Sequence, residues 1–150
     1  MIVRATVDDL SRLTEIAIES KAHWNYTSEQ INSWREDLTV SEDRFEVWEV
    51  YKFLVDDDIA GFYCLNLHKG EDTSCLEFLF VLPKFIGKAI GSQLLEHAFR
   101  LSIDHSKFYM NVLSDPNAAS FYAKYGFVEI SREESSIPGR FLPVMEKRIR

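Results

Sequence analysis

The chain has 150 residues and carries 24 acidic against 17 basic side chains, which gives a net charge of −7. This length predicts one domain, and a hydrophobic share of 46% is enough for a packed core, which argues against intrinsic disorder. The acidic balance, without a cluster of lysines and arginines, argues against a nucleic-acid binder. It weakly favours a cationic partner.

The apolar runs are far shorter than the roughly 20 residues that span a bilayer. The N-terminus, with Arg4 followed by Asp8 and Asp9, lacks the apolar core of a signal peptide. We therefore expect a cytoplasmic protein without a membrane partner. In a reducing cytosol, Cys64 and Cys75 are expected to remain thiols in the core. The histidines lack metal-ligand spacing, so we expect no metal site.

The N-terminal part of the chain predicts a short strand and two helices. Residues 2–6 alternate weakly, and Thr6 with Asp9 forms a capping-box pair at the start of the first helix. A second helix opens at Thr27 or Ser28 and runs as far as Leu38. The positions that recur at helical spacing on the apolar faces are Leu10, Leu13, Ile16, Ala17 and Ser20 in the first helix and Ile31, Trp34 and Leu38 in the second.

From residue 45 to residue 82 the hydrophobic period changes to two, which predicts an antiparallel meander. The first strand is expected to include Phe45, Val47 and residues 50–55, and the second to cover residues 59–67. The third covers residues 74–82.

The C-terminal part returns to alternating helices and strands. Apolar spacing from Ile90 to Leu101 predicts a helix, and the strand that follows at 107–113 should pair in parallel with the strand before that helix. Asp115 and Pro116 suit the N-cap and first position of a helix over 117–124. Strands at 127–131 and 141–149 close the order βαα-βββ-αβ-αββ, a mixed sheet flanked by helices in the α/β (α+β) class.

The stretch VLPKFIGKAIGS, residues 81–92, joins a strand to a helix through a loop with glycines. Such a helix start gathers unpaired backbone N–H groups and the positive end of a helix dipole, which suits an anion such as a pyrophosphate. An ordinary strand-to-helix connection has the same appearance. A second stretch, DPNAASFYAKYGF at residues 115–127, follows the next strand.

Together these stretches resemble the GCN5-related N-acetyltransferase (GNAT) superfamily, whose signatures are V-x-P-x-x-[QR]-G-x-G-x-G/A and N-A-x-x-F-Y-x-x-x-G-F. The element order also matches that fold over nearly the whole chain. The resemblance implies a single GNAT domain over residues 1–150, with a mostly antiparallel sheet of about seven strands and about four helices. It further implies an enzyme that transfers acetyl from acetyl-CoA to an amine.

Carried over by position, the resemblance implies a set of residues that bind the cofactor. Backbone groups near Leu79 and Val81 would pair with the pantetheine arm, Asn117 would contact the cofactor, and Tyr122 would lie beside its sulfur. The loop positions that would hold the pyrophosphate are Ile86, Gly87, Lys88, Ala89, Ile90, Gly91 and Ser92, with Lys84 nearby. Ile86 and Ala89 depart from the pattern, which has Gln or Arg and Gly there, so CoA affinity is expected to fall.

The reaction requires a base, because an alkylammonium with a pKa of about 10.4 is protonated at pH 7. Glu77 lies four residues before Val81 and shares a strand face with it and with Leu79. Apolar surroundings favour the protonated form of such an acid, and some GNAT enzymes have a base glutamate at this position. An exposed carboxylate or an ion-pair partner is the alternative. Tyr122 is the candidate acid for the thiolate, with Phe121 rather than Tyr122 expected in the core.

Two further segments resemble small GNAT proteins of undefined substrate: SKAHWNY at residues 20–26 and ESSIPGRFLPVM at residues 134–145. They make His23, Trp24, Tyr26 and Arg140 candidate acceptor residues. Aromatic faces suit a cationic amine, whereas Arg140 suits a carboxylate or phosphate. Loop packing or a surface ion pair explains each residue equally well.

The acceptor stays open between a small-molecule amine and a peptide amine. Exposed edge strands leave a homodimer open as well. Two other functions remain: a CoA-binding module with weak or lost catalysis, and an unrelated interaction domain.

Overall fold

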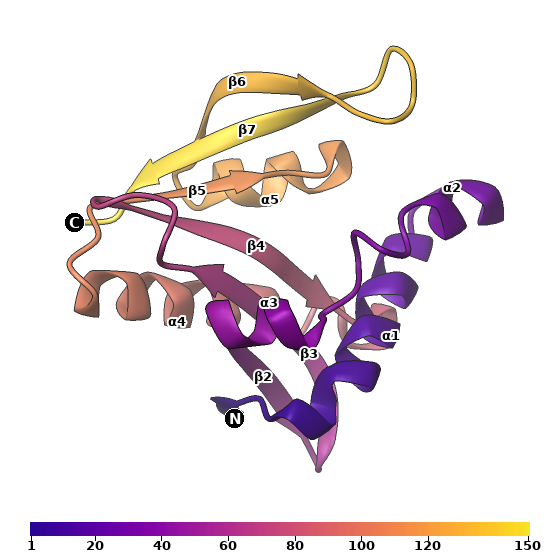
Figure 1. Cartoon of the computed structure of the whole chain (residues 1–150), viewed down its shortest axis with the longest axis horizontal. Coiled ribbons are helices and arrows are strands. Elements are labelled where there is room, and N and C mark those ends of the chain that lie inside the picture. Colours follow the sequence, from indigo (N-terminus) through magenta and orange to yellow (C-terminus); the bar gives the residue numbers. More distant parts are fainter. The chain divides into compact units, whose positions relative to one another are not determined.

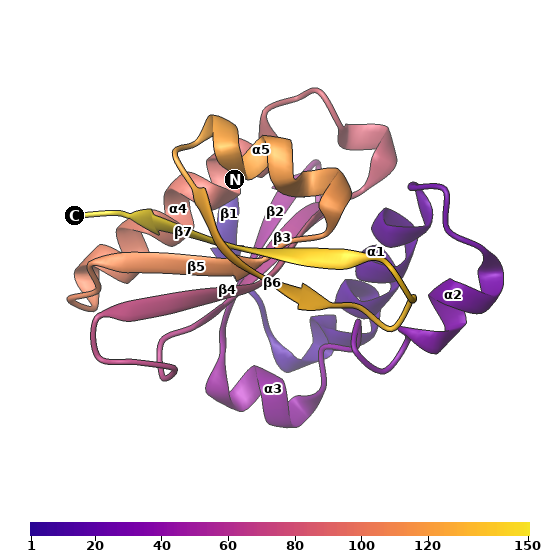
Figure 2. The same cartoon turned by 90° about the horizontal axis from the view of Figure 1, so that it is seen from above.

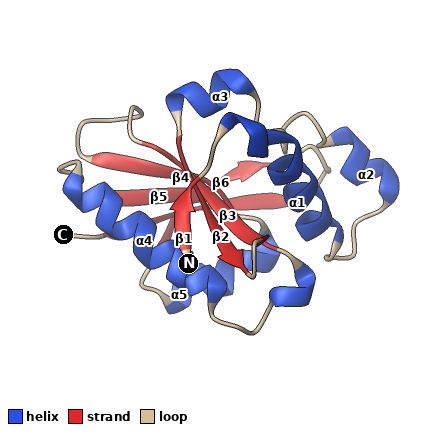
Figure 3. Cartoon of the chain, turned by 90° about the horizontal axis from the view of Figure 1, so that it is seen from below, coloured by secondary structure: helices blue, strands red, loops and turns tan.

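The computed structural model describes all residues from Met1 to Arg150 and contains one sheet of seven strands in the order β1-β2-β3-β4-β5-β7-β6 (Figure 1). The strands are β1 (Ile2–Arg4), β2 (Glu49–Val55), β3 (Asp58–Asn66), β4 (Thr73–Val81), β5 (Tyr109–Leu113), β6 (Val128–Glu134) and β7 (Phe141–Arg148). The helices are α1 (Leu10–Ala22), α2 (Ser28–Ser33), α3 (Glu42–Val47), α4 (Ile90–Asp104) and α5 (Ala119–Lys124). Short 3₁₀ turns lie at Val7–Asp9, Pro83–Phe85 and Pro116–Ala118. Figure 3 shows the helices in blue and the strands in red.

β4 and β5 pair in parallel, with Cys75 opposite Asn111. Parallel neighbours need a crossover connection, and α4 lies between them in the chain. The pairs β1–β2, β2–β3, β5–β7 and β6–β7 are antiparallel. The prediction of a mixed, mostly antiparallel sheet is therefore confirmed.

The prediction of a strand that begins at Phe45 is wrong. Residues Glu42–Val47 form α3, and β2 begins after it. Ser41 favours this helix, because its hydroxyl accepts a hydrogen bond from the amide of Arg44 at 3.2 Å and caps the helix start. Two acidic residues in the first turn favour the same helix start. The alternation of apolar residues here belongs to a short helix that leads into the strand.

The second predicted helix also ends earlier than expected, because α2 stops at Ser33. Its start is the predicted one: the Thr27 hydroxyl accepts from the Gln30 amide at 3.1 Å, and the Gln30 side chain accepts from the Thr27 amide at 2.9 Å. Trp34 and Leu38 are buried although they lie beyond the helix. Apolar spacing thus predicted burial correctly and the helix end wrongly.

The chain divides into two compact units, of which the first comprises Met1–Leu65 and Phe78–Ala98. In this unit α1 and α2 lie next to each other (Figure 2). α1 buries the predicted positions Leu13, Ile16 and Ala17. The apolar face of this helix is thus confirmed.

Within the first unit, β3 closely approaches the end of β4 at Gly61. A Cβ atom on Gly61 would lie 2.6 Å from the backbone oxygen of Phe80, so a larger residue does not fit. The rings of Phe62, Phe78 and Phe80 pack with centroids 5.6–6.3 Å apart. Alternation along β4 places Leu79 on the opposite face from these phenylalanines.

The second unit comprises Asn66–Glu77 and Phe99–Arg150. In it β5 pairs with β7 and β7 with β6, and this hairpin is drawn in orange and yellow in Figure 1. Phe127 joins its core by stacking on Phe99, with ring centroids 6.0 Å apart. β6 is exposed along its whole length.

Both cysteines are buried free thiols. No group of His, Cys, Asp and Glu side chains is arranged to hold a metal ion. None of the helices combines the length and apolarity needed to cross a membrane.

Candidate active site

The loop before α4 presents backbone amides at a helix N-terminus. The amide of Gln93 donates to the carbonyl of Ala89 at 3.2 Å, so the amides of Ile90, Gly91 and Ser92 have no partner within the helix. α4 is 15 residues long, and its dipole adds positive potential at this end. Backbone groups arranged in this way bind phosphate.

Two residues of this loop have left-handed backbone, Gly87 with φ of +87° and Ala89 with φ of +60°. A Cβ at Gly87 would meet nothing within 4 Å, so the backbone angle alone selects glycine there. Ala89 bears a conformation that costs an L-residue about 1 kcal/mol. The side chain of Ile86 is 54% exposed. The loop thus keeps the backbone amides that an anion requires. Of the two residues that differ from the family signature, Ile86 and Ala89, Ala89 has a strained backbone.

The end of β4 is held by contacts from two other elements of the first unit. The hydroxyl of Ser20, which is buried in the last part of α1, donates to the carbonyl of Val81 at 3.0 Å. The amide of Leu82 donates to the carbonyl of Ala60 in β3 at 2.8 Å. Leu79 and Val81 are themselves half-buried. The strand end that was predicted to pair with the cofactor is therefore fixed in place.

Glu77 lies in a polar cluster of the second unit. Its Oε2 atom accepts a hydrogen bond from Asn66 Nδ2 at 3.2 Å and lies 3.7 Å from Lys69 Nζ. Its Oε1 atom accepts from Cys75 Sγ at 3.5 Å. Burial, and after it the charge of Glu77, raises the pKa of the Cys75 thiol to about 12, so the thiol remains a donor. The carboxylate is an ion-pair partner, one of the alternatives that the sequence left open.

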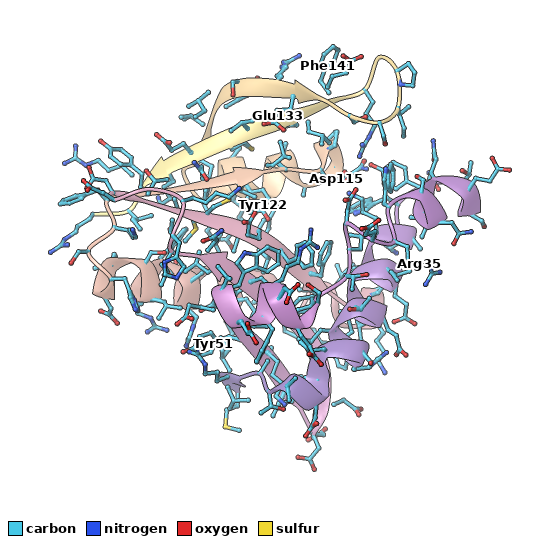
Figure 4. All side chains as sticks on the ribbon, in the orientation of Figure 1. Arg35, Tyr51, Asp115, Tyr122, Glu133 and Phe141 are labelled. Atoms are coloured by element: carbon cyan, nitrogen blue, oxygen red, sulfur yellow. The ribbon has the colours of Figure 1, made fainter.

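Tyr122, labelled in Figure 4, is buried on α5, with 5% of its surface exposed. Its ring packs against Phe127 at 5.4 Å and Phe121 at 5.3 Å. Phe121 is only half-buried, so the expectation that Phe121 rather than Tyr122 fills the core position is wrong. Burial raises the pKa of Tyr122 above its ordinary value, which keeps the hydroxyl protonated at neutral pH.

The turn before α5 is built around Asp115, also labelled in Figure 4. Its Oδ1 atom accepts from the backbone amide of Asn117 at 2.8 Å and from the Asn117 side chain at 3.0 Å. Asp115 is therefore a cap, but of the 3₁₀ turn Pro116–Ala118; α5 begins only at Ala119, later than the predicted start at 117, and its N-cap is Ala118. Its Oδ2 atom accepts from Arg140 Nη2 at 3.2 Å. The side chain of Arg140 is 16% exposed and that of Asp115 12%. Arg140 therefore has a protein carboxylate as partner.

The aromatic connector after α1 contains the other predicted acceptor residues. His23 and Trp24 pack edge to face at 5.4 Å, and Tyr26 packs in the same way on Trp34 at 4.8 Å. Lys21 Nζ lies 5.6 Å from the Tyr26 ring and 5.3 Å from the Trp34 ring. These two rings thus already bind an alkylammonium, that of the chain itself.

The two units divide the predicted site residues between them. The first contains Leu79, Val81, the loop 86–92 and the connector residues His23, Trp24 and Tyr26. The second contains Glu77, Asn117, Tyr122 and Arg140.

The contacts of three residues were not predicted from the sequence: Ser20, Asn66 and Lys69. Spacing placed Ser20 on the buried face of α1, but it did not indicate the hydrogen bond to Val81. Asn66 is the last residue of β3 and Lys69 lies in the connection to β4, and hydrophobic periodicity gives no information on the partners of their side chains.

Residues 46–129, more than half of the chain, match the family model of the acetyltransferase (GNAT) domain. The chain therefore belongs to the GNAT acetyltransferases, which are acetyl-CoA-dependent acyltransferases. No curated protein matches the sequence.

Three solved structures illustrate the similarity, each covered over nearly its whole length. A GCN5-related N-acetyltransferase from Rhodopseudomonas palustris has a TM-score of 0.82 at 23% identity, covering 99% of this chain and 94% of that one. The PaiA N-acetyltransferase from Thermoplasma acidophilum, in complex with coenzyme A, has a TM-score of 0.75 at 23% identity, with 99% and 98% covered. YncA from Salmonella typhimurium, with its cofactor acetyl-CoA, has a TM-score of 0.72 at 20% identity, with 100% and 94% covered.

Proposed function

We propose that the chain acts as one acetyltransferase domain that transfers acetyl from acetyl-CoA to a primary amine by direct attack in a ternary complex. The match of residues 46–129 to the GNAT domain carries this proposal. The unpaired amides at the start of α4 support it, because they provide a site for a phosphate group.

For acetyl-CoA, the amides from Gly87 to Ser92 hold the pyrophosphate, with Lys84 and Lys88 adding positive charge. Backbone groups of Leu79 and Val81 pair with the pantetheine arm. Asn117 contacts the cofactor, and no metal takes part. PaiA with coenzyme A and YncA with acetyl-CoA share the fold, which supports this choice of co-substrate.

Two side chains of this chain supply the acid–base chemistry. Glu77 takes a proton from the ammonium through water, since only the neutral amine attacks a thioester. Tyr122 acts as the acid, and its hydroxyl donates to the departing thiolate. The burial that raises the pKa of Tyr122 supports this role, because the donor stays protonated at the pH of the reaction. The amide C–N bond forms and the thioester C–S bond breaks, and the second proton lost by the amine nitrogen passes through water to restore the Tyr122 hydroxyl.

The acceptor is a small-molecule or peptide amine. His23, Trp24 and Tyr26 contact the acceptor away from its reacting ammonium, and the position of Lys21 Nζ beside the Tyr26 and Trp34 rings supports an aromatic cation site at this connector. Arg140 binds a carboxylate or phosphate of the acceptor with the guanidinium N–H groups that do not donate to Asp115. We place the protein in the cytoplasm, with neither nucleic acid nor membrane as partner, and the exposed β6 edge leaves room for a homodimer.

A CoA-binding module with weak or lost catalysis is the second candidate. Ala89 in a left-handed conformation and Ile86 in place of a polar residue favour it. Calorimetric titration with CoA and acetyl-CoA, followed by a thiol-release assay on a panel of amines, separates the two functions. Turnover of an amine supports the enzyme. Tight binding without turnover of any amine, polyamine or peptide supports the module.

A further inference from the structure

The carboxylate of Glu77 is held in a fixed orientation by its neighbours. Asn66, which is 8% exposed, donates from Nδ2 to Oε2 at 3.2 Å. The amide of Asn66 is itself oriented, because its Oδ1 accepts from the backbone N–H of His68 at 2.9 Å. The Cys75 thiol donates to the other carboxylate oxygen at 3.5 Å. Fixed donors on both oxygens leave the carboxylate little freedom to rotate.

The same carboxylate has an alkylammonium beside it. Lys69 Nζ lies 3.7 Å from Oε2, which is longer than a hydrogen bond. The Lys69 side chain is 57% exposed, whereas that of Glu77 is 18% exposed. An ion pair with an exposed lysine at this distance contributes little free energy, so its loss costs little. The cluster thus consists of a fixed acid and a replaceable cation.

We propose that Asn66 and Glu77 form a subsite for the ammonium group of the acceptor, that Lys69 occupies it while no acceptor is bound, and that the acceptor displaces Lys69. A primary alkylammonium has the charge and the three donors of the lysine head group, so it makes the same contact. This inference rests on the proposed function, in which Glu77 receives the proton of that group. Asn66 is a positioning residue, since it acts through Glu77.

The inference predicts competition between Lys69 and a free amine. In Lys69→Met, the Kd of n-propylammonium should fall about two- to five-fold, the range that the loss of an exposed ion pair supports. Lys69→Arg should keep the wild-type Kd of n-propylammonium. Glu77→Gln should bind n-propylammonium weakly, whether residue 69 is lysine or methionine. The measurement is a titration followed by the NMR signals of the glutamate carboxyl carbons. Lys124→Met removes an exposed lysine from α5 and is the matched control.

Kinetics provide a second readout. Lys69→Met should lower KM for an amine acceptor by a similar factor and leave KM for acetyl-CoA unchanged. Asn66→Ala should raise KM for the amine, and it should have no further effect when Glu77 is already glutamine. An additional effect of Asn66→Ala in that background would assign Asn66 a role independent of Glu77 and overturn the positioning claim.

The outcomes separate this inference from the proposed function. An unchanged Kd of n-propylammonium in Lys69→Met, or an equal change in Lys124→Met, overturns the subsite. Wild-type protein that releases no thiol with any amine contradicts the proposed function, and the NMR titration still decides whether the carboxylate binds an ammonium. Amine turnover with an unchanged Kd and KM in Lys69→Met contradicts this inference alone.

Discussion

The guanidinium of Arg140 lies 3.2 Å from one carboxylate oxygen of Asp115, whose other oxygen caps the amide of Asn117. This ion pair thus joins segment 134–145 to the turn at the start of segment 115–127, which contains the second family signature. Because both side chains are mostly buried, loss of one partner leaves a poorly solvated charge.

Arg140→Ala should therefore lower the free energy of unfolding by about 1.5–3 kcal/mol, the range for hydrogen bonds to charged groups. It should also weaken CoA binding, because Asn117 loses part of its support. Arg132→Ala is the matched control, since its pair with Glu129 is 64% and 39% exposed and contributes little. Urea unfolding and calorimetry measure both effects. Equal stability losses in the two variants would contradict a special role for the Arg140 pair.

Tyr122→Phe tests the acid. The variant keeps the ring that packs on Phe121 and Phe127, so CoA should bind as before. Loss of a general acid should lower kcat about 100-fold. Phe121→Leu, which alters the half-buried neighbour, is the control. Unchanged turnover in Tyr122→Phe would contradict the assignment.

The raised pKa of Tyr122 also predicts a pH profile. A tyrosine whose pKa lies above the ordinary value of about 10 remains protonated throughout the usual assay range. Ionisation of Tyr122 should therefore not lower the kcat of the wild type between pH 7 and about pH 10. Any decrease in this range should also be present in Tyr122→Phe. A falling limb specific to the wild type would indicate that Tyr122 ionises in this range.

The two left-handed positions of the proposed cofactor loop, Gly87 and Ala89, should respond in opposite ways to exchange of glycine and alanine. Gly87→Ala places a side chain at φ of +87° and should destabilise the loop by about 1 kcal/mol, weakening CoA binding about five-fold. Ala89→Gly relieves backbone strain at φ of +60° but increases the conformational entropy of the unfolded chain. The free energy of unfolding should therefore change little, while the affinity for CoA rises. Calorimetric titration with CoA compares them. A stronger affinity in Gly87→Ala would show that the loop changes conformation to bind.

Asp9 joins the start of α1 to β2 through Lys52, with Nζ and Oδ2 2.8 Å apart. Burial would raise the pKa of Asp9, but hydrogen bonds from Lys52 and Thr6 outweigh it and lower the pKa below its ordinary value. A lowered folded-state pKa stabilises the fold above the unfolded value of about 3.9, and this contribution is lost as the pH falls through the folded value.

We therefore expect Asp9→Asn to be less stable than the wild type at pH 7, with a difference that begins to shrink near pH 4 and is lost as the pH falls through the lower folded-state pKa of Asp9. Urea unfolding at several pH values measures this difference. Asp8→Asn, at an exposed neighbouring position, should show no such convergence. A difference in stability that is independent of pH would mean that the Asp9 charge is not what stabilises the fold.

Much of the fold followed from local sequence signals. Thr27 and Asp115 have the side chains that cap helix starts, and Leu13 and Ile16 show the spacing of a buried helix face; both kinds of signal act over a few residues. The prediction of a strand at residues 45–47 was wrong, because these residues belong to α3, which Ser41 caps, despite the alternation of apolar residues. The competition between a cap and a strand pattern is decided by tertiary packing, which a local pattern does not contain.

The candidate site was less accessible from the sequence. The family signatures predicted the cofactor loop at 86–92, and the structure shows left-handed backbone at two of its positions, Gly87 and Ala89. The contacts of Glu77 with Asn66 and Lys69 depend on how the turn between β3 and β4 folds back on the strand. The burial of Tyr122 instead of Phe121 depends on the rotation of α5, a helix too short for its apolar period to determine its buried face.

Initial rates measured while acetyl-CoA and an acceptor amine are both varied test direct acetyl transfer most directly. A ternary complex predicts double-reciprocal lines that intersect, with thiol release that depends on the amine. Parallel lines would indicate an acetylated enzyme intermediate. Parallel lines, or thiol release that no amine accelerates, would contradict direct transfer to an amine.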